Sequence, residues 1–486
     1  MQRRRTRNEF TEDLLESAFA QTRLSTADRG LCQELVYGVI RWQATLDWLI
    51  ARKTDGREQK SALQDLLRLG LYQIFWLDRI PDHAAVHETV ELAKRDGFGA
   101  QAGFVNAVLR GYLREASETK KLLAELKTTQ PAIGWSHPEW LVSRWQKRWG
   151  AERTMQLLEW NNTPPKIFAR VNTLKSSSRR DELHESQNLD RSGTRIARPS
   201  GKLFTTTLLE KWRDENVEYD FVQRDWLEEN LVFELKSHPP LAQLESFQQG
   251  GFYIQDPGTL LAPCKLAPQP GETILDFCAA PGGKTTFIAQ LMNNQGRIVA
   301  QDVSDERLKW IQENCARLGV TRVETVVSDW ARPHPDPLPQ EREQPCATRE
   351  ISNRAPFADR LATIPPLPAG EGRGEGKLFD RILVDTPCSN TGVMRRRVDL
   401  RWRIQPEEIE RLRTAQLDLL KQAAPQVKPG GVLVYSTCSL EPEENQEVVK
   451  QFLHEHADFK LEYERELLPF TDNVDGAYVA QLKRLS

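Results

Sequence analysis

The sequence predicts a multidomain protein with an all-α N-terminal bundle, a small α+β domain and a C-terminal α/β domain with a doubly wound sheet. The chain has 486 residues, which is too long for one ordinary hydrophobic core. Apolar residues recur at helical spacing in the first part of the chain, whereas strands and helices alternate in the last part. These observations place the domains at residues 1–140, 141–250 and 251–486.

The N-terminal bundle is predicted from capping residues and helical periodicity. Ser25 and Ser61 each precede a run of apolar residues at helical spacing, so each is expected to cap a helix. The pair Ile80-Pro81 ends the second helix, and two further helices are expected around residues 86–93 and 104–113. Strand signals are scarce in this region.

The other two domains contain the predicted strands. Short strand-like segments such as residues 167–171 alternate with a polar helix candidate and indicate the small α+β domain. In the α/β domain, helices at residues 305–318 and 409–420 separate strands, which implies a parallel sheet. The five strands are expected at residues 273–277, 297–302, 323–327, 379–385 and 431–437.

One segment interrupts this alternation. Residues from about 332 to 376 are rich in proline, glycine and charge and have little to bury. We expect a disordered insertion in the α/β domain, which the fold can accept because the entropy of loop closure grows only slowly with length.

Composition and charge exclude several classes of protein. Hydrophobic residues make up 39% of the chain and no run of about 18 apolar residues occurs, so no membrane association is expected. The basic start lacks an apolar signal region. The seven cysteines include no Cys-x-x-Cys pair, which indicates reduced thiols in the cytoplasm and no metal site. Since the net charge is -3, binding to nucleic acid would need a local basic patch.

A glycine-rich loop after the first strand of the α/β domain is the first candidate site. In open α/β sheets this position binds ligands, and the amide groups that begin the next helix favour a carboxylate. A nucleotide P-loop is rejected because Cys278 stands where that motif needs glycine. The candidate ligand-binding residues are Cys278, Ala279, Ala280, Pro281, Gly282, Gly283 and Lys284.

Two acidic residues extend this site. Asp302 ends the second strand, where an acid can hold ribose hydroxyls, and Asp329 follows the third strand, where it could meet an adenine amino group. A single aspartate after a strand is more often a helix cap, but several at successive strand ends favour a binding site. The Gly-x-Gly-x-x-Gly fingerprint is missing, so a ligand with ribose, adenine and an amino-acid carboxylate fits better than NAD.

Two cysteines follow the next two strands. Cys388 lies in the segment Asp385-Thr386-Pro387-Cys388, and Cys438 follows Thr437. Both thiols should face the same crevice as the ligand loop. The alternatives are small buried apolar residues or a structural disulfide, and the predicted compartment argues against the latter.

A basic patch follows Cys388. Arg395, Arg396 and Arg397 could hold phosphates beside the site and thus bind RNA, although a solvated surface charge run is an equal alternative.

Together these motifs resemble the NOP2/Sun RNA (cytosine-5) methyltransferases. Residues 34–38 and the pair Asp28-Arg29 are similar to the NusB-type RNA-binding fold, and residues 170–172 and the pair Asn161-Asn162 fit the family's small RNA-recognition-like domain. This combination is similar to bacterial small-subunit rRNA methyltransferases of the RsmB/Sun/Fmu type. The resemblance implies a Rossmann-like methyltransferase domain for the α/β part of the chain.

The resemblance also implies a reaction. S-adenosyl-L-methionine would be held by residues 278–284, Asp302, Asp329 and Asp385, and the substrate would be RNA, with unassembled 16S rRNA expected. Cys438 is the implied nucleophile at carbon 6 of cytosine, because carbon 5 needs activation before it accepts a methyl group. Cys388 would assist release, and Asp385 would bind the cytosine edge. A monomer is expected.

The sequence departs from the family pattern at two positions and leaves other functions open. Thr386 stands where the family usually has a small apolar residue, and Asn390 where it often has glycine, which would reshape the loop that carries Cys388. A tRNA cytosine-5 methyltransferase and a non-catalytic RNA-binding ribosome assembly factor remain alternatives. DNA methylation is less consistent with the sequence, because that class attacks with the Pro-Cys thiol and lacks a Thr-Cys partner.

Overall fold

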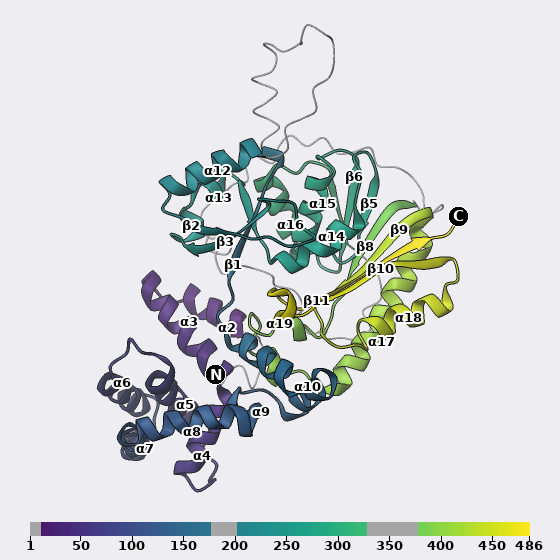
Figure 1. Cartoon of the computed structure of the whole chain (residues 1–486). Helices are drawn as coiled ribbons and strands as arrows, with labels where there is room; N and C mark the ends of the chain where they lie inside the picture. The colour runs from purple at the N-terminus through teal and green to yellow at the C-terminus, as the bar shows by residue number, and fades with distance from the viewer. Residues whose placement is uncertain (1–10, 176–201, 328–377) are drawn as a thin grey trace. The chain divides into compact units, whose positions relative to one another are not determined.

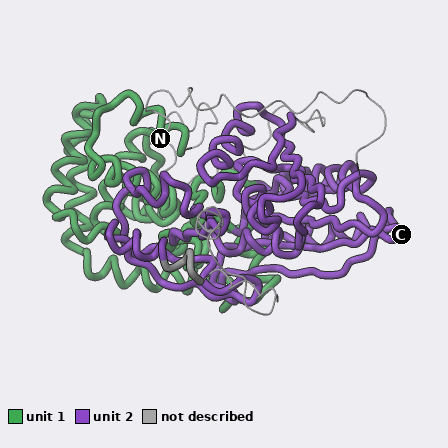
Figure 2. The backbone as a smooth tube through the Cα atoms, turned by 90° about the horizontal axis from the view of Figure 1, so that it is seen from above, with its two compact units in different colours: residues 1–165, 393–404 green, residues 166–392, 405–486 purple. Residues whose placement is uncertain are grey.

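The computed structural model describes residues 11–175, 202–327 and 378–486. The chain forms two compact units (Figure 2): unit 1 contains residues 1–165 and 393–404, and unit 2 contains residues 166–392 and 405–486. Residues 141–165 thus group with the helical N-terminal part, which differs from the predicted boundary at residue 140. The predicted insertion at 332–376 lies outside the described residues.

Unit 1 is helical, as the sequence predicts (Figure 1). Ser25 caps the second helix by accepting a hydrogen bond from the amide of Asp28, which confirms that prediction. Ser61 begins its helix but does not cap it, because the N-cap residue is Lys60. The helices are α2 (Thr11–Ala20), α3 (Thr26–Arg41), α4 (Gln43–Lys53), α5 (Ser61–Trp76), α6 (Asp82–Arg95), α7 (Ala102–Arg114), α8 (Ala116–Thr129), α9 (Pro131–Gly134) and α10 (Glu139–Asn162).

A close contact between α3 and α5 explains one glycine of the NusB-like motif. A Cβ atom at Gly38 would lie 1.9 Å from the ring of Tyr72, so only glycine fits there. The Tyr72 hydroxyl donates a hydrogen bond (2.5 Å) to Glu34, which lies one helical turn before Gly38 in α3. Glu34 and Gly38 therefore act together to seat one aromatic ring in the core of unit 1.

Residues 393–404, which we call the strap, follow the Cys388 loop in sequence but belong to unit 1. Arg401 is fully buried and donates to the carbonyl groups of Asn161 (3.0 Å) and Ser136 (3.2 Å) and to Oδ1 of Asn162 (2.8 Å). The Trp402 ring nitrogen donates to the carbonyl of Ile40. Burial lowers the pKa of Arg401 to about 9.

Unit 2 contains two sheets. The smaller is fully antiparallel, with strands in the order β2-β3-β1-β4, and α12 (Lys202–Asp214) and α13 (Glu245–Gln248) accompany it. This α+β arrangement agrees with the predicted small domain. The strands are β1 (Ile167–Val171), β2 (Glu218–Phe221), β3 (Val232–Ser237) and β4 (Phe252–Ile254).

The larger sheet has seven strands in the order β10-β11-β9-β8-β5-β6-β7. The five predicted strands pair in parallel, but two C-terminal strands that the sequence did not indicate pair antiparallel, so the sheet is mixed. The strands are β5 (Thr273–Asp276), β6 (Arg297–Asp302), β7 (Val323–Val327), β8 (Phe379–Asp385), β9 (Val427–Thr437), β10 (Phe459–Leu467) and β11 (Ala477–Arg484). The helices are α14 (Leu261–Leu266), α15 (Gly283–Leu291), α16 (Asp305–Leu318), α17 (Pro406–Ala423), α18 (Gln446–Glu455) and α19 (Pro469–Asp472).

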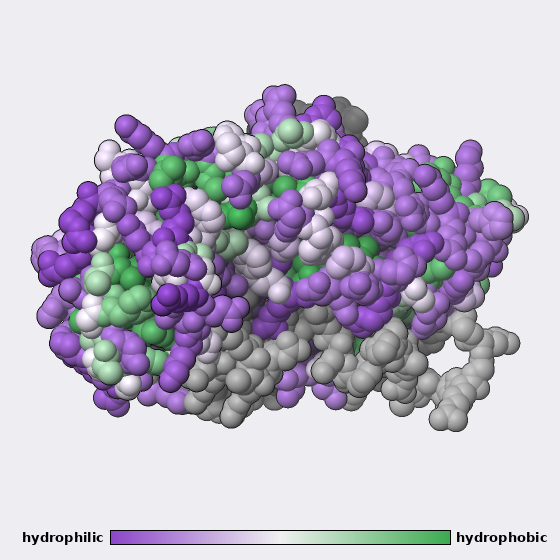
Figure 3. All heavy atoms as spheres, turned by 90° about the horizontal axis from the view of Figure 1, so that it is seen from below, coloured by the Kyte–Doolittle hydropathy of each residue, from purple (hydrophilic) through white to green (hydrophobic). Residues whose placement is uncertain are grey.

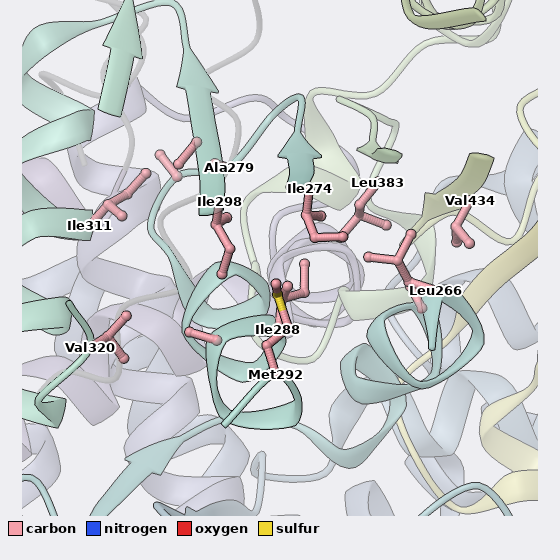
Figure 4. Close-up of a cluster of buried hydrophobic side chains, with 14 of the residues drawn as sticks. Leu266, Ile274, Ala279, Ile288, Met292, Ile298, Ile311, Val320, Leu383 and Val434 are labelled. Atoms are coloured by element: carbon pink, nitrogen blue, oxygen red, sulfur yellow. The ribbon is translucent and has the colours of Figure 1, made fainter. Parts of the chain in front are cut away.

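An apolar cluster between the sheet and its helices supports the glycine-rich loop (Figure 4). Ile274 of β5 and Ile298 of β6 face Ile288 of α15 and Ile311 of α16, and Ala279 of the loop joins the same cluster. These residues are buried, so their packing fixes where the loop leaves the sheet.

The surface is largely polar on the face drawn in Figure 3, where apolar side chains lie in small groups among hydrophilic ones. Among the described helices, none is both long and apolar enough to cross a membrane.

We predict that Arg401→Ala destabilises unit 1 by about 3 kcal/mol, because several buried acceptors lose their donor and a large buried side chain is removed. Thermal or urea unfolding measures this loss. The half-buried Arg397 of the same strap is the control, and Arg397→Ala should change stability by only about 0.5 kcal/mol. Equal effects of the two substitutions would contradict a special role for Arg401.

Candidate functional site at the carboxyl edge of the parallel strands

The candidate residues that the structure describes in unit 2 lie at one edge of the larger sheet. Strands β5, β6, β8 and β9 run parallel, so Asp276, Asp302, Asp385 and Thr437, at their carboxyl ends, share that edge. Ligands of open α/β sheets bind there. Asp329, a predicted cofactor residue, lies outside the described residues.

The glycine-rich loop joins β5 to α15 at this edge. Its Ala280–Pro281 peptide bond is cis, and Gly282 takes a left-handed conformation (φ 98°) as the N-cap of α15, without a side-chain cap. A Cβ atom at Gly283 would lie 3.2 Å from Tyr253 and from Gln255. The first amides of α15 therefore begin in a tight, glycine-dependent turn, which suits an anionic group of a ligand.

Asp302 holds the loop from the next strand. One carboxylate oxygen accepts from the amide of Ala280 (3.1 Å), and the other accepts from the amide of Val303 (2.8 Å) and lies 3.2 Å from Arg307. Burial raises the pKa of Asp302, and Arg307 and the two amides oppose this effect. The predicted ligand residue is thus also a structural anchor of the predicted ligand loop.

Asp276 is a site residue that the sequence analysis did not select. It is 1% exposed, its Oδ2 accepts from the Thr285 hydroxyl (2.7 Å), and its Oδ1 has no hydrogen-bond partner among the described residues. Burial and the nearby Asp385 and Asp302 raise its pKa to about 7, against Thr285 and Lys284. Its position as the last residue of β5 was the available signal, since the same rule selected Asp302.

Cys388 and Cys438 are brought together, with their sulfur atoms 3.1 Å apart and both present as free thiols. The amide of Cys438 also donates to the sulfur of Cys388 (3.3 Å). Cys388 is buried, whereas Cys438 is partly exposed. Burial and the adjacent Cys438 raise the pKa of Cys388 well above its ordinary value, so Cys388 is held as a neutral thiol.

The two departures from the family pattern fit the loop without distorting it. Asn390 takes the left-handed conformation that favours glycine (φ 58°), which asparagine tolerates well. Its amide nitrogen donates to the carbonyl of Cys388 (2.8 Å), and its carbonyl oxygen accepts from the Cys438 thiol (3.0 Å). The Thr386 hydroxyl lies 3.4 Å from the carbonyl of Ser436, while its amide donates to the same oxygen (3.0 Å).

Asp385 connects the cysteine loops to the glycine-rich loop. Its two carboxylate oxygens accept from Nζ of Lys284 (2.5 Å) and from the Ser436 hydroxyl (2.6 Å). Lys284 belongs to the ligand loop and Ser436 lies two residues before Cys438. Asp385 is therefore oriented by both parts of the site.

The basic patch of the sequence analysis is divided by the structure. Arg395 is 2% exposed and its guanidinium lies 4.0 Å from the centre of the Trp160 ring, within unit 1. Such a stacked, buried cation stabilises unit 1 and is not a surface contact for phosphate. Arg396 and Arg397 are half-buried, and their RNA-binding role stays a prediction. Their sequence pattern could not separate them from Arg395.

These features define a Rossmann-like methyltransferase domain, joined to a small ferredoxin-like domain and a helical NusB-like region. From the N-terminus onward, the matching family models are the NusB family at residues 1–114, the Methyltr_RsmF/B-like, ferredoxin-like domain at 137–191, and 16S rRNA methyltransferase RsmB/F at 263–356 and 367–483. The chain belongs to the RsmB/F family of 16S rRNA methyltransferases, which confirms the resemblance and makes it an RNA methyltransferase.

Relatives of nearly full length support this assignment. The chain is 34% identical to the "Probable ribosomal RNA small subunit methyltransferase B" of Bacillus subtilis, over 98% of this chain and 95% of the relative. It is 32% identical to the ribosomal RNA small subunit methyltransferase B of Escherichia fergusonii, over 95% and 92%.

Solved structures share the fold. A methyltransferase homolog protein from Pyrococcus horikoshii is 27% identical and covers 73% of this chain and 97% of its own, with a TM-score of 0.51. The crystal structure of PH0851 has a TM-score of 0.66 over 96% of this chain and 93% of its own, at 22% identity.

We predict that Asp276 makes unit 2 less stable as the pH rises. Its pKa is about 7 when folded and near 3.8 when unfolded, so between these values the folded state keeps a proton that the unfolded state has released. The free energy of unfolding therefore falls as the pH rises through this window, by on the order of 4 kcal/mol from this group. Asp276→Asn cannot titrate and should flatten the slope in urea titrations at a series of pH values.

Asp380→Asn, at the opposite end of β8, is the matched control. Burial raises the pKa of Asp380, but hydrogen bonds from Lys428 and from the amide of Thr273 outweigh burial and lower it. Its contribution is present above the unfolded pKa and is lost as the pH falls, so this substitution should change the slope in the opposite direction. Identical slopes for both variants would contradict the assignment for Asp276.

Proposed function

We propose that this RNA methyltransferase transfers a methyl group from S-adenosyl-L-methionine to carbon 5 of a cytosine, through a covalent adduct with Cys438. The observation that carries the proposal is the pair of free thiols, 3.1 Å apart, at the sheet edge that also holds the glycine-rich loop. Cytosine carbon 5 is a weak nucleophile, and a thiolate that adds to carbon 6 activates it.

The loop residues fit the proposed cofactor. The first amides of α15 suit its carboxylate, and Asp302 at the end of β6 suits its ribose hydroxyls. The buried Asp276 Oδ1 leaves one further acceptor at the same edge. We assign binding to Cys278, Ala279, Ala280, Pro281, Gly282, Gly283, Lys284, Asp302 and Asp385, with Asp329 retained from its sequence position. The cofactor would supply an electrophilic methyl group.

Cys438 is the better nucleophile because it is partly exposed, whereas Cys388 is buried and held neutral by its raised pKa. Attack forms a bond from sulfur to carbon 6 and moves the electrons of the C5=C6 double bond to carbon 5, which takes the methyl group. Loss of the carbon-5 proton to a base then restores the double bond and expels the Cys438 thiolate.

Cys388 would assist the last step. Its thiol lies beside the sulfur of Cys438 and can donate a hydrogen bond to the departing thiolate. Asp385, oriented by Lys284 and Ser436, would bind the amino edge of the cytosine and hold the ring in register with both sulfur atoms.

The proposed substrate is 16S rRNA before small-subunit assembly, in keeping with the family and with the names of the relatives. Arg396 and Arg397 are proposed phosphate contacts. We propose a cytoplasmic monomer. A tRNA substrate is the alternative within the same chemistry, and transfer of labelled methyl groups to purified rRNA and tRNA distinguishes the two. A purely structural assembly factor would transfer none.

We predict that substitution of the two cysteines affects methyl transfer and the covalent complex with RNA in different ways. Cys438→Ala should abolish methyl transfer and every covalent complex with RNA, because no adduct can form. Cys388→Ala should still permit attack and methyl transfer but slow release, so a protein–RNA conjugate that requires S-adenosyl-L-methionine should persist on a denaturing gel. A trapped complex in the Cys438 variant would reverse the assignment.

We predict that Asp302→Ala weakens binding of S-adenosyl-L-methionine by about 10- to 100-fold, the loss expected when a charged acceptor of two hydroxyls is removed. RNA affinity should stay near that of the unchanged protein. Calorimetry measures the first quantity and filter binding the second. Asp380→Ala is the control, and a variant of Asp302 that loses RNA affinity alone would refute the assignment.

A further inference from the structure

A buried carboxylate outside the reacting groups links the two cysteine loops. Glu444, in the turn after β9, is fully buried. Its Oε1 accepts from the amide of Ser389 (2.7 Å) and from Nε2 of Gln416 (3.0 Å). Its Oε2 accepts from the hydroxyl groups of Ser389 and Ser439. Burial raises its pKa to about 7, against these hydrogen bonds.

Two of the hydrogen-bond partners of Glu444 are serines that each lie next to one of the two cysteines. Ser389 directly follows Cys388, and Ser439 directly follows Cys438. The two serine hydroxyls also lie 3.0 Å from each other. One side chain thus binds the residue next to each thiol, although the two cysteines lie far apart in the sequence and on different loops.

Neighbouring groups hold Glu444 and the loops in this arrangement. Gln416 of α17 also donates to the carbonyl of Pro387, on the other side of Cys388 (2.8 Å). The Tyr435 hydroxyl donates to the carbonyl of Glu444 (2.6 Å). Asn445 donates to the carbonyl of Ser439 (2.9 Å) and accepts from the hydroxyl of Thr437 (2.6 Å), which brackets Cys438. The turn is therefore fixed to both loops by groups that are themselves buried.

We propose that Glu444 is a positioning residue, which sets the separation of the Cys388 and Cys438 thiols by tying together the residues that follow them. The catalytic importance of this role rests on the proposed function. The separation of the two thiols can be measured without substrate. Among the described residues, the hydrogen bonds of the Glu444 carboxylate go to Ser389, Ser439 and Gln416 and not to either sulfur, so it acts through the residues that follow the two cysteines. The rate of a reaction that needs two groups in contact depends on how they are positioned, and a displacement of about 1 Å can lower the rate about 100-fold.

Three substitutions separate position from charge and from folding. Glu444→Gln is isosteric: its oxygen can keep the two nitrogen donors, and its amide nitrogen can donate to the serine hydroxyls, which rotate to accept. Glu444→Asp keeps the carboxyl group on a side chain that is one methylene shorter, so it should draw the two loops inward. Glu444→Ala removes the link. Glu215→Ala is the matched control, because Glu215 likewise accepts from the amide and hydroxyl of one serine, Ser246, in the region of the smaller sheet.

The first measurement is disulfide formation between Cys388 and Cys438 with diamide, followed by peptide mapping. Two thiols lose two electrons and two protons to the azo group of diamide, which becomes a hydrazine. The rate reports the thiol separation and needs neither RNA nor cofactor. We expect Glu444→Gln to stay within about threefold of the unchanged chain, and Glu444→Ala to fall by about 100-fold. If the Ala variant does not fold, Glu444→Asp provides the test, with an intermediate fall.

The second measurement is methyl transfer by the same variants, with circular dichroism as the check on folding. Glu444→Ala or Glu444→Asp should lower kcat while leaving KM for S-adenosyl-L-methionine unchanged, and Glu215→Ala should lower neither. A folded Glu444→Ala with an unchanged disulfide rate, or a Glu215→Ala with the same loss, overturns the proposal. If the unchanged chain forms the disulfide rapidly but transfers no methyl group, the proposed function fails while the positioning role stands.

Discussion

The parallel register of β8 and β9 is the constraint on which the rest of the site depends. This register pairs Asp385 with Ser436. Cys388 and Cys438 each follow that pair by a few residues, so the two loops leave the sheet side by side and their sulfur atoms meet. A slip of one residue in this register would turn alternate side chains to the opposite face and separate the thiols. The hydrogen bond from Ser436 to Asp385 joins the same pair through side chains.

The antiparallel strand β11 completes the other side of this arrangement. It pairs with β9 from Val432 to Thr437, so β9 lies between β8 and β11 as far as Ser436, two residues before Cys438. The chain before β11 also contacts the Cys388 loop, because the amide of Gly392 donates to the carbonyl of Cys438 and the amide of Gly476 donates to the carbonyl of Gly392. A Cβ atom at Gly392 would lie 2.5 Å from the Gly476 carbonyl oxygen, so the approach requires glycine.

Two fully buried arginines, one in each unit, donate to carbonyl, amide and hydroxyl oxygens of the described residues instead of to carboxylates. Arg170 of β1 donates to Gln255, Thr286 and the carbonyl of Gly283, and thus fixes the smaller sheet to the start of α15. Burial lowers its pKa to about 9. In unit 1, Arg401 likewise joins separate segments by donating to the carbonyl of Asn161 and the side-chain amide oxygen of Asn162. A guanidinium offers five fixed donors, so it can satisfy several backbone carbonyls at once. Some basic residues of this chain therefore stabilise the fold, so a basic residue in the sequence does not by itself indicate an RNA-binding surface.

The sequence by itself determined the local elements and the motifs. Helical periodicity and the Ser25 cap located the first helices, alternating strands and helices located the parallel strands, and the order of motifs identified the family, because each of these signals is carried by residues close in sequence. Only the tertiary structure decided which polar groups meet. It buried Arg395 against Trp160, added two antiparallel strands, and placed the side chains of Asp276, Asn390 and Glu444 in hydrogen bonds with the loops of the candidate site. Burial and hydrogen bonds between distant segments depend on how those segments pack, so the spacing of residues along the sequence does not predict them.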